Sequence, residues 1–166
     1  MLIVRKALIL TIGLTTVLSA CSTQQLVNSE NKTAKLQISR EQTPAKDDIA
    51  ELNSIVLLPN VPEEVIWREE VDSKNHKKLV AVMRFSKEDE KNIIEKAKRY
   101  REPESAEVSA EDWFPPELSA QTELAGDETL KGISYSAKDF IQLPYTSGRL
   151  VKISNSDYFV LELSTE

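Results

Sequence analysis

Few side chains in this sequence have the chemistry needed for catalysis or metal binding. Cys21 is the only cysteine and His76 the only histidine in 166 residues. A zinc site needs several Cys or His ligands, so we expect no metal, and no disulfide can form within the chain. His76 lies in a polar stretch between Asn75 and Lys77, which favours a solvent-exposed turn over a catalytic base. The sequence has no nucleophile-elbow or phosphate-binding glycine pattern.

Acidic side chains are abundant, with 27 Asp and Glu. A glycosidase needs two carboxylates at a defined separation, and abundance alone does not indicate such a pair. An Asp/Glu glycosidase is therefore the least favoured interpretation of the function. We predict a non-enzymatic protein without a cofactor.

Aromatic residues are the strongest candidates for a binding surface, namely Trp67, Trp113, Phe114 and Tyr145. Rings near acidic groups such as Glu111 and Asp112 can stack on sugars or anchor a protein partner. The competing interpretation places the tryptophans in the hydrophobic core. Two prolines follow Phe114 and favour this second interpretation, because they would hold the aromatic pair against the domain.

The N-terminus has the pattern of a secretory signal. Arg5 and Lys6 precede an uncharged, largely apolar run over residues 7–18. As a helix, this run would be about 18 Å long, too short for a hydrocarbon core of about 30 Å. The small residues Ser19 and Ala20 follow, as a signal peptidase requires.

Leu18-Ser19-Ala20-Cys21 resembles the lipobox of bacterial lipoproteins. The resemblance covers about the first 21 residues and implies a signal peptide over 1–20, cleavage before Cys21 and a diacylglyceryl group on its sulfur. The alternative is an ordinary signal peptide that leaves a free thiol, which is unusual in an oxidising compartment. Two or three acyl chains would bind the membrane far more firmly than one.

The resemblance also implies a cellular address. In Gram-negative lipoproteins with this kind of signal, Asp directly after the lipidated cysteine commonly retains the protein in the inner membrane. Ser22 occupies that position here. We therefore predict a lipid-anchored protein on the periplasmic face of the outer membrane, if the bacterium is Gram-negative. Its expected partners are another envelope protein or assembly or, alternatively, peptidoglycan or another glycan.

The charge of the mature chain argues against nucleic-acid binding. Residues 1–20 carry two of the 21 basic residues and none of the acidic ones, so their removal lowers the net charge from −6 to about −8. Nonspecific binding to nucleic acid needs an excess of Lys and Arg. An acidic surface is also repelled by anionic lipids, so we expect membrane contact through the acyl anchor.

Residues 21–50 are predicted to form a lipidated, flexible tether, because they contain few large apolar residues and no aromatic ones. A partly helical arm that docks through Leu36, Ile38 and Ile49 is the alternative. Residues 51–166 are predicted to form one globular domain. In this region, residues 55–58 read as a buried strand or packed arm that ends at Pro59.

Two strand pairs and one helix stand out in the domain. Apolar runs at 65–67 and 79–85 flank a polar loop and predict an antiparallel pair, with the odd-numbered residues from Leu79 to Phe85 pointing inward. Ser86 is expected to cap a helix that ends before Pro103. Residues 149–153 and 158–163 predict a C-terminal hairpin.

The region between the helix and the final hairpin, residues 102–148, is predicted to be largely irregular. It contains one short helix over 117–124, a turn at 126–128 and a one-turn helix through Phe140. The fold class expected from this order is α+β, with a small antiparallel sheet packed on one principal helix and a long irregular segment.

Overall fold

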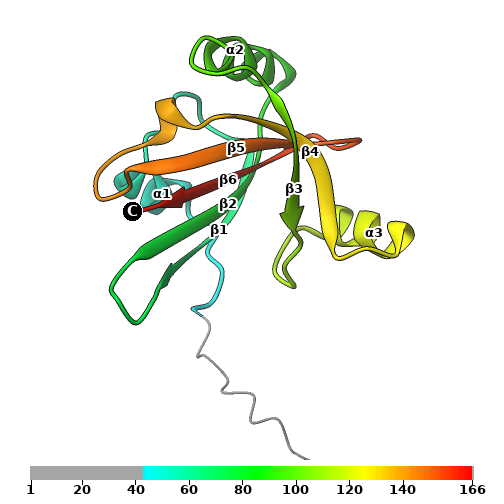
Figure 1. Ribbon diagram of the computed structural model, residues 1–166, viewed down its shortest axis with the longest axis horizontal. Coiled ribbons are helices and arrows are strands. Elements are labelled where there is room, and N and C mark those ends of the chain that lie inside the picture. Colours follow the sequence, from blue (N-terminus) through cyan, green and yellow to red (C-terminus); the bar gives the residue numbers. More distant parts are fainter. Residues whose placement is uncertain (1–42, 166) are drawn as a thin grey trace, which may run out of the picture. The chain divides into compact units, whose positions relative to one another are not determined.

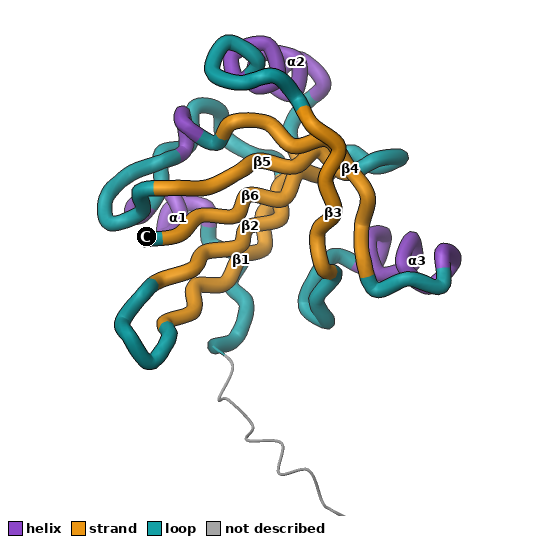
Figure 2. Tube along the Cα trace, viewed as in Figure 1, coloured by secondary structure: helices purple, strands orange, loops and turns teal. Residues whose placement is uncertain are grey.

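A computed structural model describes residues 43–165 of the chain. These residues form a mixed α+β domain with a six-stranded, fully antiparallel sheet in the order β1-β2-β6-β5-β4-β3 (Figures 1 and 2). The strands are β1 Glu64–Val71, β2 Lys77–Arg84, β3 Glu104–Ser109, β4 Thr129–Ser136, β5 Ser147–Ile153 and β6 Tyr158–Ser164. The helices are α1 Ile49–Ile55, α2 Lys87–Ala97, α3 Pro116–Ala125 and the short 3-10 helix η1 Lys138–Phe140.

Both predicted strand pairs are confirmed. β1 pairs with β2 across the polar loop, and β5 pairs with β6 across a turn at 154–157. The inward direction of the odd-numbered residues from Leu79 to Phe85 is confirmed, because all four lie in one core cluster. The even-numbered Val80 and Val82 are also buried, in a second cluster on the opposite face. β2 lies between β1 and β6, and packed side chains cover both faces of residues 79–83, so neither face of this stretch turns to solvent.

The predicted helix after β2 is also confirmed. The Ser86 hydroxyl accepts a hydrogen bond from the Asp89 backbone N–H, which satisfies one of the free donors at the start of α2. Ile93 and Ala97 are buried against the sheet, whereas Tyr100 lies beyond the helix and is largely exposed.

The prediction of a long irregular segment over 102–148 is wrong, because β3, α3, β4 and η1 all lie within it. The predicted short helix and the turn after it are confirmed by α3 and by Gly126, whose φ of +65° suits a glycine at a helix end. β4 escaped detection because its apolar side chains change face: Leu130 lies on one face, Tyr135 on the other. β3 has one large buried apolar side chain, Val108, and is an edge strand.

β4 bends strongly along its length (Figure 1). Gly132 lies in the middle of this strand. A Cβ atom added there would lie 2.4 Å from the Lys152 carbonyl oxygen and 2.8 Å from Val151 Cγ1. No side chain fits at that separation, so the close approach of β4 to β5 requires glycine. β3 pairs with residues 129–134 of β4 and is the edge strand beside this bend.

The sheet has a hydrophobic core on each face, so the expectation of one principal helix is not confirmed. On the first face, α1, α2 and η1 pack over a cluster that includes Trp67, Met83 and Phe159. On the second face, Phe114 and Leu118 of the α3 region pack over Val82 and Val160. Figure 1 shows α2 and α3 on opposite sides of the sheet.

The residues before β1 dock against its outer edge. Lys46 and Trp67 exchange two backbone hydrogen bonds of 2.8 and 2.7 Å. The next pair in this register would need a donor from Pro44, which has none, so the contact stays a single bridge. Asp48 then caps α1, which ends at Ile55. Residues 55–58 are therefore the packed arm and not the strand of the two alternatives, because Val56 is buried and Leu58 packs against the first core. The predicted tether thus ends in docked residues, and its part before residue 43 lies outside the described residues.

Candidate functional site

Two of the predicted binding aromatics are core residues. Trp67 is 2% exposed and its Nε1–H donates to the Asp48 carbonyl oxygen at 3.2 Å. Tyr145 is 1% exposed, and its hydroxyl donates to Glu69. Burial and Glu69 raise the pKa of Tyr145. Neither ring has an open face on which a sugar could stack. The predicted lipidation site, Cys21, lies outside the described residues.

The other two aromatics join β1 to the segment between β3 and α3. Phe114 is 4% exposed and lies in the second core. Trp113 is half-buried, packs edge-on against Phe114 with ring centroids 4.7 Å apart, and donates from Nε1 to Glu111 at 2.7 Å. The Arg68 guanidinium lies 5.1 Å from the Trp113 ring centroid. The pair therefore fastens a loop to the sheet and offers little free ring surface.

Arg68 itself is only 7% exposed. Its Nη1 lies 3.4 Å from Glu111 and 3.9 Å from Glu70, and its Nη2 lies 4.0 Å from Asp112. These carboxylates compensate the buried charge, as a buried cation requires. This cluster joins β1 to the β3–α3 segment on the second face of the sheet. It marks the end of the packed part of that face.

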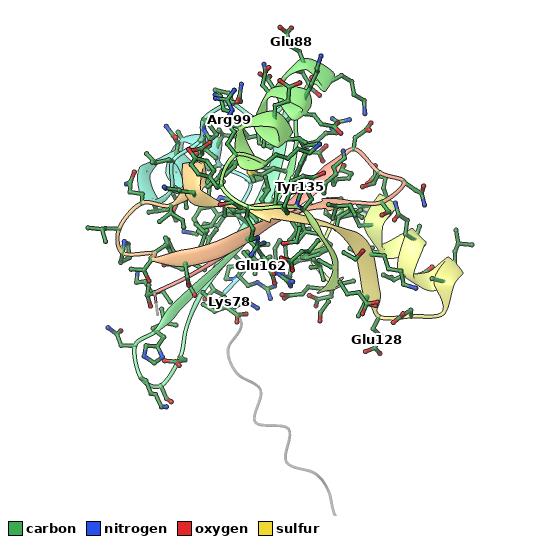
Figure 3. The ribbon with its side chains drawn as sticks, turned by 45° about the horizontal axis from the view of Figure 1, so that its top comes forward. Lys78, Glu88, Arg99, Glu128, Tyr135 and Glu162 are labelled. Atoms are coloured by element: carbon green, nitrogen blue, oxygen red, sulfur yellow. The ribbon has the colours of Figure 1, made fainter. Side chains whose placement is uncertain are left out.

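Beyond this boundary, the second face of the sheet forms an open groove with a volume of about 920 Å³. We use "the groove" for the space lined by Glu70, Lys78, Arg101, Arg149, Glu162 and Ser164, with Thr43 and the β1–β2 turn at its margins. Figure 3 shows Glu162 and Lys78 on the side of the sheet away from Tyr135 and α2.

Strand register places the groove's side chains in rows. Arg68, Val80, Glu162 and Arg149 are cross-strand neighbours along one row, and Glu70, Lys78 and Ser164 follow in the next. Arg149 pairs through Nε with Glu162, and its Nη2 donates to the Glu107 carbonyl oxygen of β3 at 3.1 Å. Arg149 thus connects the floor of the groove to the free edge of β3.

Two cations at the groove have no ion-pair partner among the described residues. The Lys78 side chain makes no hydrogen bond or ion pair with any residue in the part of the chain that the structure describes. Arg101 donates only to the Ser134 hydroxyl, at 3.0 Å, among those same residues. In an acidic protein, two cations that face one groove and form no ion pair favour an anionic or acidic ligand group.

The only histidine lies at the groove's margin, in the exposed β1–β2 turn. His76 Nδ1 is 3.1 Å from Asp72 Oδ2, and Asp72 Oδ1 accepts backbone N–H bonds from Lys74 and His76. The backbone bond from His76 is the largest cause that lowers the pKa of Asp72. The Asp72 carboxylate therefore holds the turn in shape. Within residues 43–165, no cluster of His, Cys, Asp and Glu could hold a metal ion.

The groove residues were not singled out from the sequence. Their signal is a charged side chain inside each strand of the final hairpin: Arg149 and Glu162 lie directly opposite each other. Such a pair shows that part of the second face is polar. Lys78 and Arg101 join it only through the sheet's long-range pairing and the bend of β4, neither of which is visible locally.

None of the helices among the described residues is long and apolar enough to cross a membrane. Comparisons of the chain with protein-family models, curated proteins and solved structures found no match.

Proposed function

We propose that this chain is a lipoprotein of the bacterial envelope, anchored through Cys21, whose domain binds another envelope protein without catalysing a reaction. The observation that carries the proposal is the open, charged groove on a rigid antiparallel sheet. Protein partners are recognised by such concave surfaces when charge and shape are complementary. The lipobox supplies the anchor and the groove supplies the recognition surface.

The groove lies where the chain from the anchor enters the domain, because Thr43 lines its margin. Residues 22–42 separate this point from Cys21. If they are flexible, as predicted, their root-mean-square reach is about 25 Å. A partner held in the groove would then lie close to the membrane that carries the acyl anchor. We propose the periplasmic face of the outer membrane as that site.

The groove supports binding better than catalysis. Its acid and base groups are mostly engaged in fixed pairs, Arg149 with Glu162 and His76 with Asp72. A general acid or base needs a free group directed at a bound substrate. Glycan binding through aromatic stacking is less well supported than protein binding, because Trp67, Phe114 and Tyr145 are buried.

Co-purification of the full-length protein from crosslinked envelopes of its own bacterium tests the proposal. Neutralising the groove in the variant Lys78→Gln with Arg101→Gln should remove the captured partner. The matched control, Lys91→Gln with Lys98→Gln, neutralises two exposed lysines of the α2 region outside the groove and should retain it. Equal capture by both variants would contradict the groove's role. Retention on purified peptidoglycan sacculi, lost in the groove variant, would favour the glycan alternative.

A further inference from the structure

We propose that the free edge of β3 accepts an extended segment of the partner protein as an added β-strand, with acidic side chains directed into the groove. This inference rests on the proposed function and specifies how the groove holds its partner. The mode of recognition would be strand addition, in which backbone hydrogen bonds supply affinity and side-chain contacts supply selectivity.

Half of the backbone groups of β3 point away from β4. Alternate residues of an antiparallel strand bond the same neighbour. Ala110 N–H bonds the Glu128 carbonyl oxygen, so the even-numbered residues of β3 bond β4. The N–H and C=O groups of Ser105, Glu107 and Ser109 therefore point away from β4. Among the described residues, the only group bonded to them is Arg149 Nη2, on the Glu107 oxygen.

The two edges of the sheet differ in whether another segment of the described chain already pairs with them. At the β1 edge, Lys46 already exchanges both backbone hydrogen bonds with Trp67. Pro44, two residues before Lys46, occupies the next pairing position along β1. A new strand could not lie along β1 without displacing this contact. β3 has no such cover among the described residues. Natural proteins protect unpaired edges in several ways, so an open edge beside a groove indicates a place for pairing.

The space and the positive charge beside β3 would suit an added acidic strand. A second hollow of about 710 Å³ follows β3 and β4 and shares Arg101 and Arg149 with the groove. An added strand would lie along both hollows. Its side chains on the groove side would face Arg101 and Lys78, which have no carboxylate partner within residues 43–165. Acidic side chains at alternate positions of the added strand would compensate these cations.

A second copy of this chain is a poor occupant. Antiparallel pairing of β3 with β3 of another copy about Glu107 would place the two Glu107 side chains directly opposite each other. Like charges on neighbouring strands destabilise a pair. We therefore assign the edge to a partner protein.

Amide hydrogen exchange on the mature chain, carrying Cys21→Ser to prevent acylation, tests the inference. The probe is a blocked heptapeptide of alternating threonine and glutamate, and its control has lysine in place of glutamate. The glutamate peptide should slow exchange at Ser105, Glu107 and Ser109 by about tenfold or more, and bind at least about tenfold more tightly than the control.

Two variants separate edge pairing from other binding. Glu107→Pro removes one outward N–H without touching the bonds to β4 and should weaken peptide binding by about tenfold or more, whereas Glu107→Ala keeps the N–H and should change it by less than about threefold. Equal binding by both would overturn strand addition. Slow exchange at these amides in the absence of peptide would also overturn strand addition by a partner. If the slow exchange depended on protein concentration, a second copy of the chain would occupy the edge. If it did not, the chain's own N-terminal segment would occupy the edge.

The same titration distinguishes this inference from the proposed function. NMR chemical-shift changes at Lys78 and Glu162 on addition of the peptide, without slower exchange at the three β3 amides, would support binding in the groove and refute strand addition. No response at either place would refute the acidic strand as the ligand, while the envelope crosslinking described above would still test the groove itself.

Discussion

Replacing Phe114 by alanine should destabilise the domain far more than replacing its neighbour Trp113. Phe114 is 4% exposed and packs with Leu118 and Val108 in the second core, so its truncation leaves a cavity. Buried Phe→Ala substitutions cost about 3–5 kcal/mol. Domains of this size have about 5–15 kcal/mol of unfolding free energy. The melting temperature should therefore fall by about 10–25 °C.

Trp113→Ala removes less. Its half-buried ring contributes a partial apolar term of about 1 kcal/mol, a hydrogen bond to Glu111 of about 1 kcal/mol and a contact with Arg68 of about 0.5–1 kcal/mol. The expected loss is about 2–3 kcal/mol. Leu124→Ala is the surface control, because Leu124 is 90% exposed and its loss should stay within about 0.5 kcal/mol.

Urea unfolding followed by far-UV circular dichroism measures these differences without relying on tryptophan fluorescence. The expected order of destabilisation is Phe114→Ala, then Trp113→Ala, then Leu124→Ala. If Phe114→Ala cost less than about 1 kcal/mol, or less than Trp113→Ala, the second core would not be as the structure shows it.

Three further predictions test other parts of the account. Gly132→Ala should cost about 2–3 kcal/mol in urea unfolding, because its Cβ would lie 2.4 Å from the Lys152 carbonyl oxygen, whereas Gly126→Ala, in open space at φ +65°, should cost about 1 kcal/mol; equal costs would contradict the close approach of β4 and β5. Burial, and then Glu64, raise the pKa of Tyr158 from 10.0 to about 12, so the stability from its neutral phenol should be complete below pH 10 and be lost as the pH rises toward 12. Urea midpoints at about pH 8 and pH 11 should therefore differ less in Tyr158→Phe than in wild type, and an unchanged difference would argue against this role. Cys21→Ala should abolish fatty-acid labelling and leave an unprocessed precursor, and retained label in that variant would end the lipoprotein interpretation.

Local patterns were sufficient where the chain's own neighbours determine structure. The β1–β2 hairpin, the Ser86 cap and the β5–β6 hairpin each follow from alternation or capping within about ten residues. β4 could not be found in this way, because Gly132 and Ser134 occupy one face and interrupt the alternation. β3 depends on pairing with β4, so the loss of one strand also hid the other.

The candidate site was less accessible to sequence reasoning than the fold. A binding surface was predicted from the aromatic residues, but Trp67, Phe114 and Tyr145 are buried. The groove is built instead from ordinary charged residues on five separate segments, brought together by strand order and by the bend of β4. No short-range spacing joins Lys78 to Arg101, Arg149 and Glu162.

Site-specific photocrosslinking in the native bacterium tests most directly whether the groove is the binding surface. A photoreactive amino acid is placed at Lys78 in the groove or, as a control, at exposed Leu124 on α3, and adducts of the full-length lipoprotein are detected with an antibody. If the groove is the binding surface, we expect one discrete envelope-protein adduct from position 78. This adduct should be absent from position 124 and should disappear when Arg101→Gln is added. Adduct formation from position 124 but not from position 78 would contradict it.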